Sequence, residues 1–130
     1  MKPEYDLAGK VIGFTMKVHS TLGAGFLESV YQKALEHELK KAGMLFESQK
    51  ALTVNYDGNL VGEFIADLLV EHELIVELKA VQSLATPHEV QTVNYLVATG
   101  MDTGLLLNFG AERLEFKKKF RLPKSDTVSL

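Results

Sequence analysis

Two carboxylates and an amine lie within an apolar stretch of the chain, the seventeen-residue run FIADLLVEHELIVELKA. Asp67, Glu77 and Lys79 stand where a buried sheet would normally carry apolar side chains. Two carboxylates that lie close together repel each other unless a positive charge sits between them. Oxygen ligands favour magnesium or manganese over zinc. A lysine beside such a metal can hold or polarise a water molecule and stabilise negative charge on a phosphate.

The pairing of two expected strands decides whether these side chains meet. Glu77 and Lys79 share one face of the strand expected over 74–80, because side chains alternate along a strand. Asp67 shares that face only if paired residue numbers add to an even value, as when Val70 pairs with Leu74 around a three-residue turn. That register places Asp67 opposite Glu77, with Cβ atoms roughly 5 Å apart. A cross-strand ion pair of Lys79 with either carboxylate is the alternative interpretation.

Two expected helices carry further polar residues. Glu28 stands in the first turn of the second helix, and Tyr31 and Leu35 follow it on nearly the same side, so we expect Glu28 to face the packed side. A simple interaction with the helix dipole is the alternative. Gln91 and Tyr95 are four residues apart and share one face of the third helix. Gln91 is a candidate to orient Lys79 or the water, and a polar flank of an amphipathic helix is its alternative role.

Periodicity and turn residues predict the elements that position these side chains. Apolar stripes predict a first helix that ends near Thr21 and a second that ends at Gly43. Asp57-Gly58 predicts a hairpin, and Thr86-Pro87-His88-Glu89 reads as a capping box with proline at the first helical position of a third helix, which stops at Gly100. Strands are expected over 46–56, 64–70, 74–80, 103–109 and 114–120. The order predicts an α/β fold in which helices cover both faces of a mixed sheet.

Length and composition narrow the class of protein. The chain has 130 residues, 46% of them hydrophobic, which predicts a single domain over 1–130. No apolar run is long enough to span a membrane, and the N-terminal residues are too polar for a secretory signal, so we expect a soluble, cytoplasmic protein without a membrane partner. The absence of cysteine excludes disulfides, a thiolate nucleophile and thiolate metal ligands.

Basic residues gather near the C-terminus, although the net charge is −3. Segment 113–124 carries six cationic residues and one glutamate, a net +5, which leaves −8 for the rest of the chain. Such a basic strip can contact phosphates, and the alternative is an edge strand protected by lysines. A chain this small offers little surface to hold a duplex, which favours a homodimer formed through an edge strand or the first helix.

The order of the polar residues resembles the PD-(D/E)XK nuclease superfamily: an acidic residue on a helix, Asp67, then Glu77-x-Lys79, then Gln91-x-x-x-Tyr95 on a helix. Segment 25–31, GFLESVY, looks like the signature of the GxxExxY protein family. The resemblance continues through ADLLV, IVELKA, VQTVNYL and GLLLNFG and covers about 14–120. Ala66 takes the place of the proline in the superfamily's name, and that proline contacts no metal in the pattern.

This resemblance implies an αβββαβ core that hydrolyses phosphodiester bonds of nucleic acid, DNA or RNA, with Mg²⁺ or Mn²⁺. Lys79 would serve the attacking water, supported by Gln91 and Tyr95. The implied metal ligands are Glu28, Asp67, Glu77 and the carbonyl of Leu78. The expected substrate contacts are Tyr31, Lys117, Lys118, Lys119 and Arg121. A regulatory or nucleic-acid-binding domain that keeps the fold without turnover is the alternative function.

Other chemistries fit the sequence less well. Three His-Glu pairs, at 37–38, 72–73 and 88–89, lack the second histidine of the zinc-protease motif. The GAG at 23–25 follows a helix and lacks the later glycine and lysine of a nucleotide-binding loop. A glycosidase needs one protonated carboxyl group, and a lysine between the two carboxylates would keep both ionised.

Overall fold

The structure, a computed structural model, describes residues 6–121. Its elements follow the predicted order: α1 (Leu7–Leu22), α2 (Glu28–Lys41), β1 (Phe46–Tyr56), β2 (Asn59–Val70), β3 (Leu74–Lys79), α3 (Thr86–Thr99), β4 (Thr103–Asn108) and β5 (Glu115–Phe120). The five strands form one sheet in the order β1-β2-β3-β4-β5. The β3–β4 pair is parallel and the other pairs are antiparallel.

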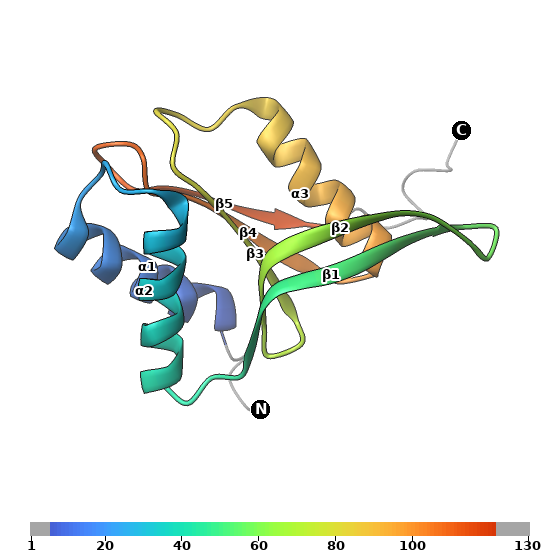
Figure 1. The fold of residues 1–130 in the computed structure, drawn as a ribbon, viewed down its shortest axis with the longest axis horizontal. Helices are drawn as coiled ribbons and strands as arrows, with labels where there is room; N and C mark the ends of the chain where they lie inside the picture. The colour runs from blue at the N-terminus through green and yellow to red at the C-terminus, as the bar shows by residue number, and fades with distance from the viewer. Residues whose placement is uncertain (1–5, 122–130) are drawn as a thin grey trace.

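Helices cover both faces of this mixed sheet, which confirms the predicted α/β class (Figure 1). α1 and α2 pack on one face, where the buried side chains of β2, β3 and β4 include Leu68, Val76 and Leu105. α3 packs on the other face through Leu96, against Leu69 and Ile75. β3 and β4 are buried on both faces, as expected for parallel neighbours between helix layers.

The predicted turns are present, and one predicted helix cap is wrong. Asp57 and Gly58 both have positive φ, 53° and 76°, as the tight hairpin between β1 and β2 requires. The expected capping box at the start of α3 does not form. The cap residue is Ala85, whose N–H donates to His88 Nδ1 at 3.0 Å, and Glu89 instead forms an ion pair with Lys119 at 3.0 Å.

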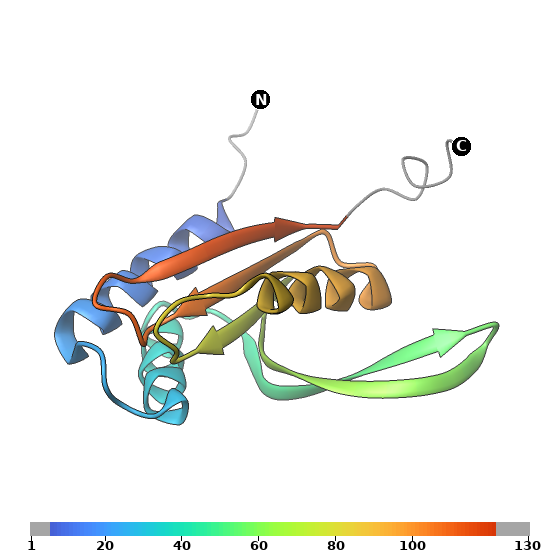
Figure 2. The same cartoon turned by 90° about the horizontal axis from the view of Figure 1, so that it is seen from above.

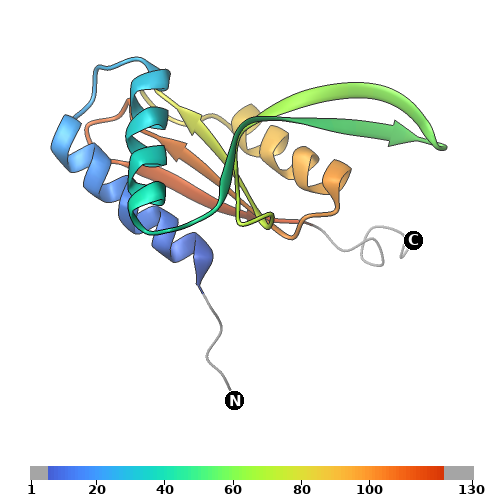
Figure 3. The same cartoon turned by 60° about the horizontal axis from the view of Figure 1, so that its bottom comes forward.

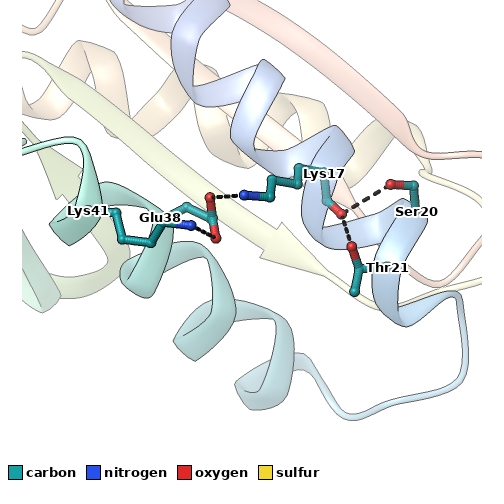
Figure 4. A network of polar contacts seen from close by, with 5 residues as sticks. All are labelled: Lys17, Ser20, Thr21, Glu38 and Lys41. Carbon is teal, nitrogen blue, oxygen red and sulfur yellow. Dashed lines mark hydrogen bonds and ion pairs between the residues drawn. The ribbon is translucent and has the colours of Figure 1, made fainter.

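Polar side chains join α1 to α2 (Figure 4). Glu38 on α2 lies 3.1 Å from Lys17 Nζ on α1 and 3.4 Å from Lys41 Nζ. On the buried side of α2, Tyr31 stacks on Phe109 with ring centroids 4.5 Å apart. These contacts fix the position of α2 over the sheet and therefore the place of Glu28 at its first turn.

The hairpin of β1 and β2 bends where it leaves the sheet. The β1–β2 ladder pairs Ser48 with Leu68 and Lys50 with Ala66, but the intervening Gln49 has φ 51°. Ala66 and Leu69 both pack on the α3 side, although strict alternation along β2 would place them on opposite faces. Beyond this bend the hairpin extends past α3 and away from α1 and α2 (Figures 2 and 3).

Two glycines permit close approaches, one at each end of β3, since Gly104 pairs with Ile75 and Gly110 lies against Val81. A Cβ at Gly104 on β4 would lie 3.2 Å from Thr92 Cγ2 and 3.3 Å from Leu96 Cδ2, so α3 lies close to the sheet here. A Cβ at Gly110 would lie 2.4 Å from the backbone nitrogen of Val81. Only glycine allows the end of β4 to contact the segment that directly follows Lys79.

None of the helices within residues 6–121 is both long enough and apolar enough to cross a bilayer.

Candidate metal centre

The predicted register of β2 and β3 is confirmed. Val70 pairs with Leu74, and the ladder continues through Leu69–Ile75 to Leu68–Val76, so paired numbers add to an even value. Asp67 and Glu77 occupy the next position of this register, at the point where backbone pairing ends. There a side chain replaces the backbone acceptor: Oδ2 of Asp67 accepts a hydrogen bond from the Leu78 N–H at 2.7 Å.

Glu77 is the most perturbed carboxyl group of the site. Glu77 is only 6% exposed, and its Oε1 is buried without a hydrogen-bond partner among residues 6–121. Burial raises the pKa of Glu77 to about 9, helped by the negative charge of Asp67 and by hydrogen bonding to it, and opposed by Lys79. The expectation that the lysine keeps both carboxylates ionised is therefore wrong for Glu77. A buried oxygen without a partner costs free energy unless a donor or a cation reaches it.

Lys79 lies beside both carboxylates at the end of β3 without forming an ion pair. It is half-buried, and its charge opposes the rise in pKa of both Glu77 and Glu28. No ion pair within 4 Å involves Lys79 in the described range 6–121. The simple cross-strand ion pair, the alternative role for this lysine, is therefore not observed.

Glu28 lies near the carboxylates but not in the orientation expected from the sequence. Its neighbours Tyr31 and Leu35 are fully buried, whereas Glu28 itself is exposed. The expectation that it faces the packed side is therefore wrong. Partial burial raises the pKa of Glu28, the charge of Asp67 adds to this rise, and Lys79 opposes it. Glu28 is thus close enough to interact electrostatically with the site.

α3 brings Tyr95 to the same group of residues. Tyr95 stacks on Phe64 of β2 with ring centroids 3.7 Å apart and planes inclined by 11°. Burial raises the pKa of its hydroxyl, as do the charges of Glu77 and Asp67, while hydrogen bonding with Gln91 lowers it. Gln91 is exposed on α3 and reaches the site through Tyr95.

Tyr31, expected from the resemblance to contact substrate, has a structural role instead. Its side chain is 0% exposed. Its hydroxyl donates to the Gly23 carbonyl and accepts from the Phe26 N–H. Tyr31 therefore holds the segment between α1 and α2 against the core and cannot reach a ligand without unpacking.

The basic strip divides between two faces of β5. Lys117 pairs with Leu106, which pairs with Glu77, so these three residues form one row across the sheet. Lys117 is exposed and lies two strands from Glu77, about 10 Å away at the usual strand spacing. Lys118 points to the opposite face, with its Nζ 5.7 Å from the Phe120 ring centroid.

Of the other basic residues of the strip, Arg113 is exposed before β5, and two form ion pairs. Lys119 forms an ion pair with Glu89, and Arg121 with Asp102 at 2.8 Å. Lys124 lies outside the described residues. Lys117 is therefore the strip residue best placed to meet a ligand at the carboxylates.

Sequence reasoning missed the polar residues that hold the site in place. Asn108 on β4 is fully buried. Its Oδ1 accepts from the Val81 N–H at 2.9 Å, and its Nδ2 donates to Glu115 at 2.8 Å, while Glu115 also accepts from the Leu84 N–H. The loop after Lys79 is fixed by these contacts. An asparagine inside the apolar run GLLLNF was the available signal, since a buried polar side chain needs partners.

The donor set fits a hard divalent cation held by few protein ligands. Within residues 6–121, no three His, Asp or Glu side chains come close enough together to hold a metal ion. The pair Asp67 and Glu77 is therefore the centre of the candidate site. Magnesium is commonly bound by one or two carboxylates with waters and substrate oxygens, and the unpartnered Glu77 oxygen is suited to that role.

Comparisons with known proteins identify the superfamily and the fold of the chain. A family model of the PD-(D/E)XK nuclease superfamily matches residues 5–120, and the chain belongs to that superfamily. Among solved structures, the chain resembles SSO0001 with a TM-score of 0.58 at 18% identity, over 77% of this chain and 53% of that one. It also resembles an alkaline exonuclease from Laribacter hongkongensis, LHK-Exo, with a TM-score of 0.52 at 9% identity, over 94% of this chain and 73% of that one.

These similarities establish the fold. The chain spans about half the length of SSO0001. Among curated proteins, none matches the sequence significantly.

Proposed function

We propose that this protein is a nuclease that hydrolyses phosphodiester bonds of nucleic acid with the help of Mg²⁺ or Mn²⁺. The observation that carries the proposal is the buried, unpartnered oxygen of Glu77 beside Asp67. Membership of the PD-(D/E)XK nuclease superfamily supports it. Within that superfamily, the segment GFLESVY at 25–31 favours the GxxExxY family.

Asp67, Glu77 and the Leu78 carbonyl would hold the cation. The Leu78 N–H faces Asp67, and the N–H and C=O of one strand residue point to the same side, so the Leu78 carbonyl faces the site as well. Glu28, exposed at the first turn of α2, would act through an intervening water. A bound divalent cation supplies Lewis-acid polarisation of the phosphate and activates water.

The chain's own residues would then complete the chemistry. Lys79 is free of ion pairs within the described part of the chain, so its ammonium can orient the attacking water and stabilise charge on the phosphate. Gln91 and Tyr95 would support it from α3. Stacking on Phe64 holds the Tyr95 ring in place.

A nucleic-acid-binding domain without turnover is the alternative. Within residues 6–121, Lys119 and Arg121 are engaged in ion pairs, whereas an electrostatically strained carboxylate pair has no use in a domain that only binds. The arrangement of charges therefore favours the enzyme.

Calorimetric titration with Mg²⁺ and Mn²⁺, followed by cleavage assays on single-stranded and duplex DNA and RNA, tests the proposal. We expect the parent protein to bind metal and cleave at least one substrate, and Asp67→Asn to lose both. Asp57→Asn is the matched control, because Asp57 lies in the hairpin turn, where asparagine accepts the same positive φ. Metal binding without cleavage of any of the four substrates would favour the binding domain.

We predict that Lys117→Ala weakens nucleic-acid binding more than Lys118→Ala does. Lys117 lies on the face of the carboxylates, and Lys118 on the opposite face. Loss of one phosphate contact should reduce the slope of log K against log[salt] by about 0.7–0.9. Binding measured by fluorescence anisotropy over a range of salt concentrations, without added metal, checks this. Equal effects of the two substitutions would place the nucleic acid elsewhere.

A further inference from the structure

Two glutamines converge on Asp67 from outside the motif. Gln32 on α2 is only 9% exposed, and its Nε2 lies 3.1 Å from the backbone oxygen of Asp67 and 3.0 Å from Ser48 Oγ. Gln49 on β1 donates to Gln32 Oε1 at 3.0 Å and contacts Asp67 Oδ1 at 3.4 Å. The two amides are therefore linked to each other and to Asp67.

The backbone of Gln49 adopts a conformation that strands avoid. Its φ of 51° is left-handed, which is unfavourable for a residue with a side chain. The neighbouring pairs Ser48–Leu68 and Lys50–Ala66 are intact, so the distortion is confined to the position opposite Asp67. Strain confined to one residue, at the strand position that faces a candidate ligand, indicates that the neighbouring contacts need it.

Three atoms of Asp67 are thereby held from three elements. Oδ2 accepts from Leu78 on β3, Oδ1 contacts Gln49 on β1, and the backbone oxygen accepts from Gln32 on α2. Glu77 is held less firmly, since its Oε1 has no partner among the described residues. Asp67 is thus the fixed carboxylate of the pair.

We propose that Gln49 and Gln32 are positioning residues that fix the Asp67 carboxylate for metal binding, with the left-handed turn at Gln49 directing its amide to the site. The contacts of the two glutamines with Asp67 follow from the hydrogen-bond geometry, and their role in metal binding rests on the proposed function. Partners of metal-binding carboxylates commonly change metal affinity when they are removed.

The test uses substitutions that separate the effect of the backbone conformation from the effect of the side-chain amide. Gln49→Gly accepts the left-handed conformation and removes only the side chain, and Gln32→Met preserves the approximate volume without hydrogen bonds. Asn94→Ala, at an exposed position of α3, is the control. The first readout is hydrogen exchange at the Leu78 amide in the metal-free protein, measured by NMR, and the second is Mn²⁺ affinity by calorimetry.

We expect both glutamine substitutions to speed exchange of the Leu78 amide at least several-fold, because a mobile Asp67 carboxylate protects it less, and to weaken Mn²⁺ binding by about 10–100-fold. Asn94→Ala should change neither. If Gln32→Met fails to fold, Gln49→Gly decides alone.

Unchanged Leu78 exchange in the folded variants would overturn the proposal, as would unchanged Mn²⁺ affinity when the parent binds the ion. If the parent binds no Mn²⁺, the proposed metal-dependent function fails. The exchange measurement still decides whether the glutamines fix Asp67, because it needs no metal.

Discussion

Lys79→Ala is expected to lower phosphodiester cleavage by about a hundredfold or more, as removal of one positioned electrostatic group commonly does. Metal affinity should remain, since Asp67 and Glu77 are unchanged. Lys79 lies beside both carboxylates but forms no ion pair in the described residues. Its removal should therefore affect the chemical step and not the assembly of the site. Single-turnover cleavage and calorimetric metal titration on the same preparations measure the two effects.

Lys118→Ala is the matched control for this experiment, because Lys118 lies on the face of β5 away from the carboxylates. The activity of a contaminating nuclease would not change with either substitution. Equal activity in the two variants and the parent would therefore contradict a catalytic role for Lys79. Loss of metal binding in Lys79→Ala would indicate a structural role instead.

The register of β2 and β3 followed from a requirement of the site, because Asp67 shares the face of Glu77 only when paired numbers add to an even value. The apolar residues agree with this register. A one-residue shift of β2 against β3 would move Leu68 out of the α1–α2 core that Val76 occupies. The packing of the sheet and the carboxylates of the site therefore require the same pairing.

The surroundings of the carboxylates could not be read from sequence in the same way. Seven-residue spacing placed Glu28 above Leu35, but Leu35 is fully buried and Glu28, at the first turn of α2, is exposed. The left-handed turn at Gln49 has no local signal, because glutamine does not favour positive φ. Both features depend on contacts between elements far apart in the chain. Gln32, for example, meets Asp67 across 35 positions of sequence.

The pH dependence of stability gives the second large effect, which we expect at Glu77. Burial first, and then the charge of Asp67, raises the pKa of Glu77 from 4.5 to about 9. Below pH 4.5 the group is protonated in both the folded and the unfolded protein. Between pH 4.5 and about 9 only the folded protein holds the proton, so the free energy of unfolding falls as the pH rises, by up to about 1.4 kcal/mol per pH unit.

Glu77→Gln removes this dependence, because glutamine does not titrate. The metal-free parent should melt at a progressively lower temperature than Glu77→Gln as the pH is raised from 5.5 to 8.5, and comparison of the two at each pH cancels the contributions of other titrating groups. Glu63→Gln, at an exposed position of the hairpin, should behave as the parent does. Thermal melts in the presence of a chelator measure the difference.

Added magnesium should reverse the loss of thermal stability at high pH in the parent but not in Glu77→Gln. A cation that binds the ionised carboxylate pair stabilises the folded protein in proportion to the logarithm of its concentration above Kd. It also lowers the pKa of Glu77, which burial and the charge of Asp67 hold high. Added Mg²⁺ at pH 8.5 is therefore expected to raise the melting temperature of the parent and to leave Glu77→Gln unchanged. If Glu77→Gln instead melts far below the parent at pH 8.5 and Mg²⁺ changes neither protein, Glu77 serves as a structural partner in the sheet, and the carboxylate pair is not a metal centre.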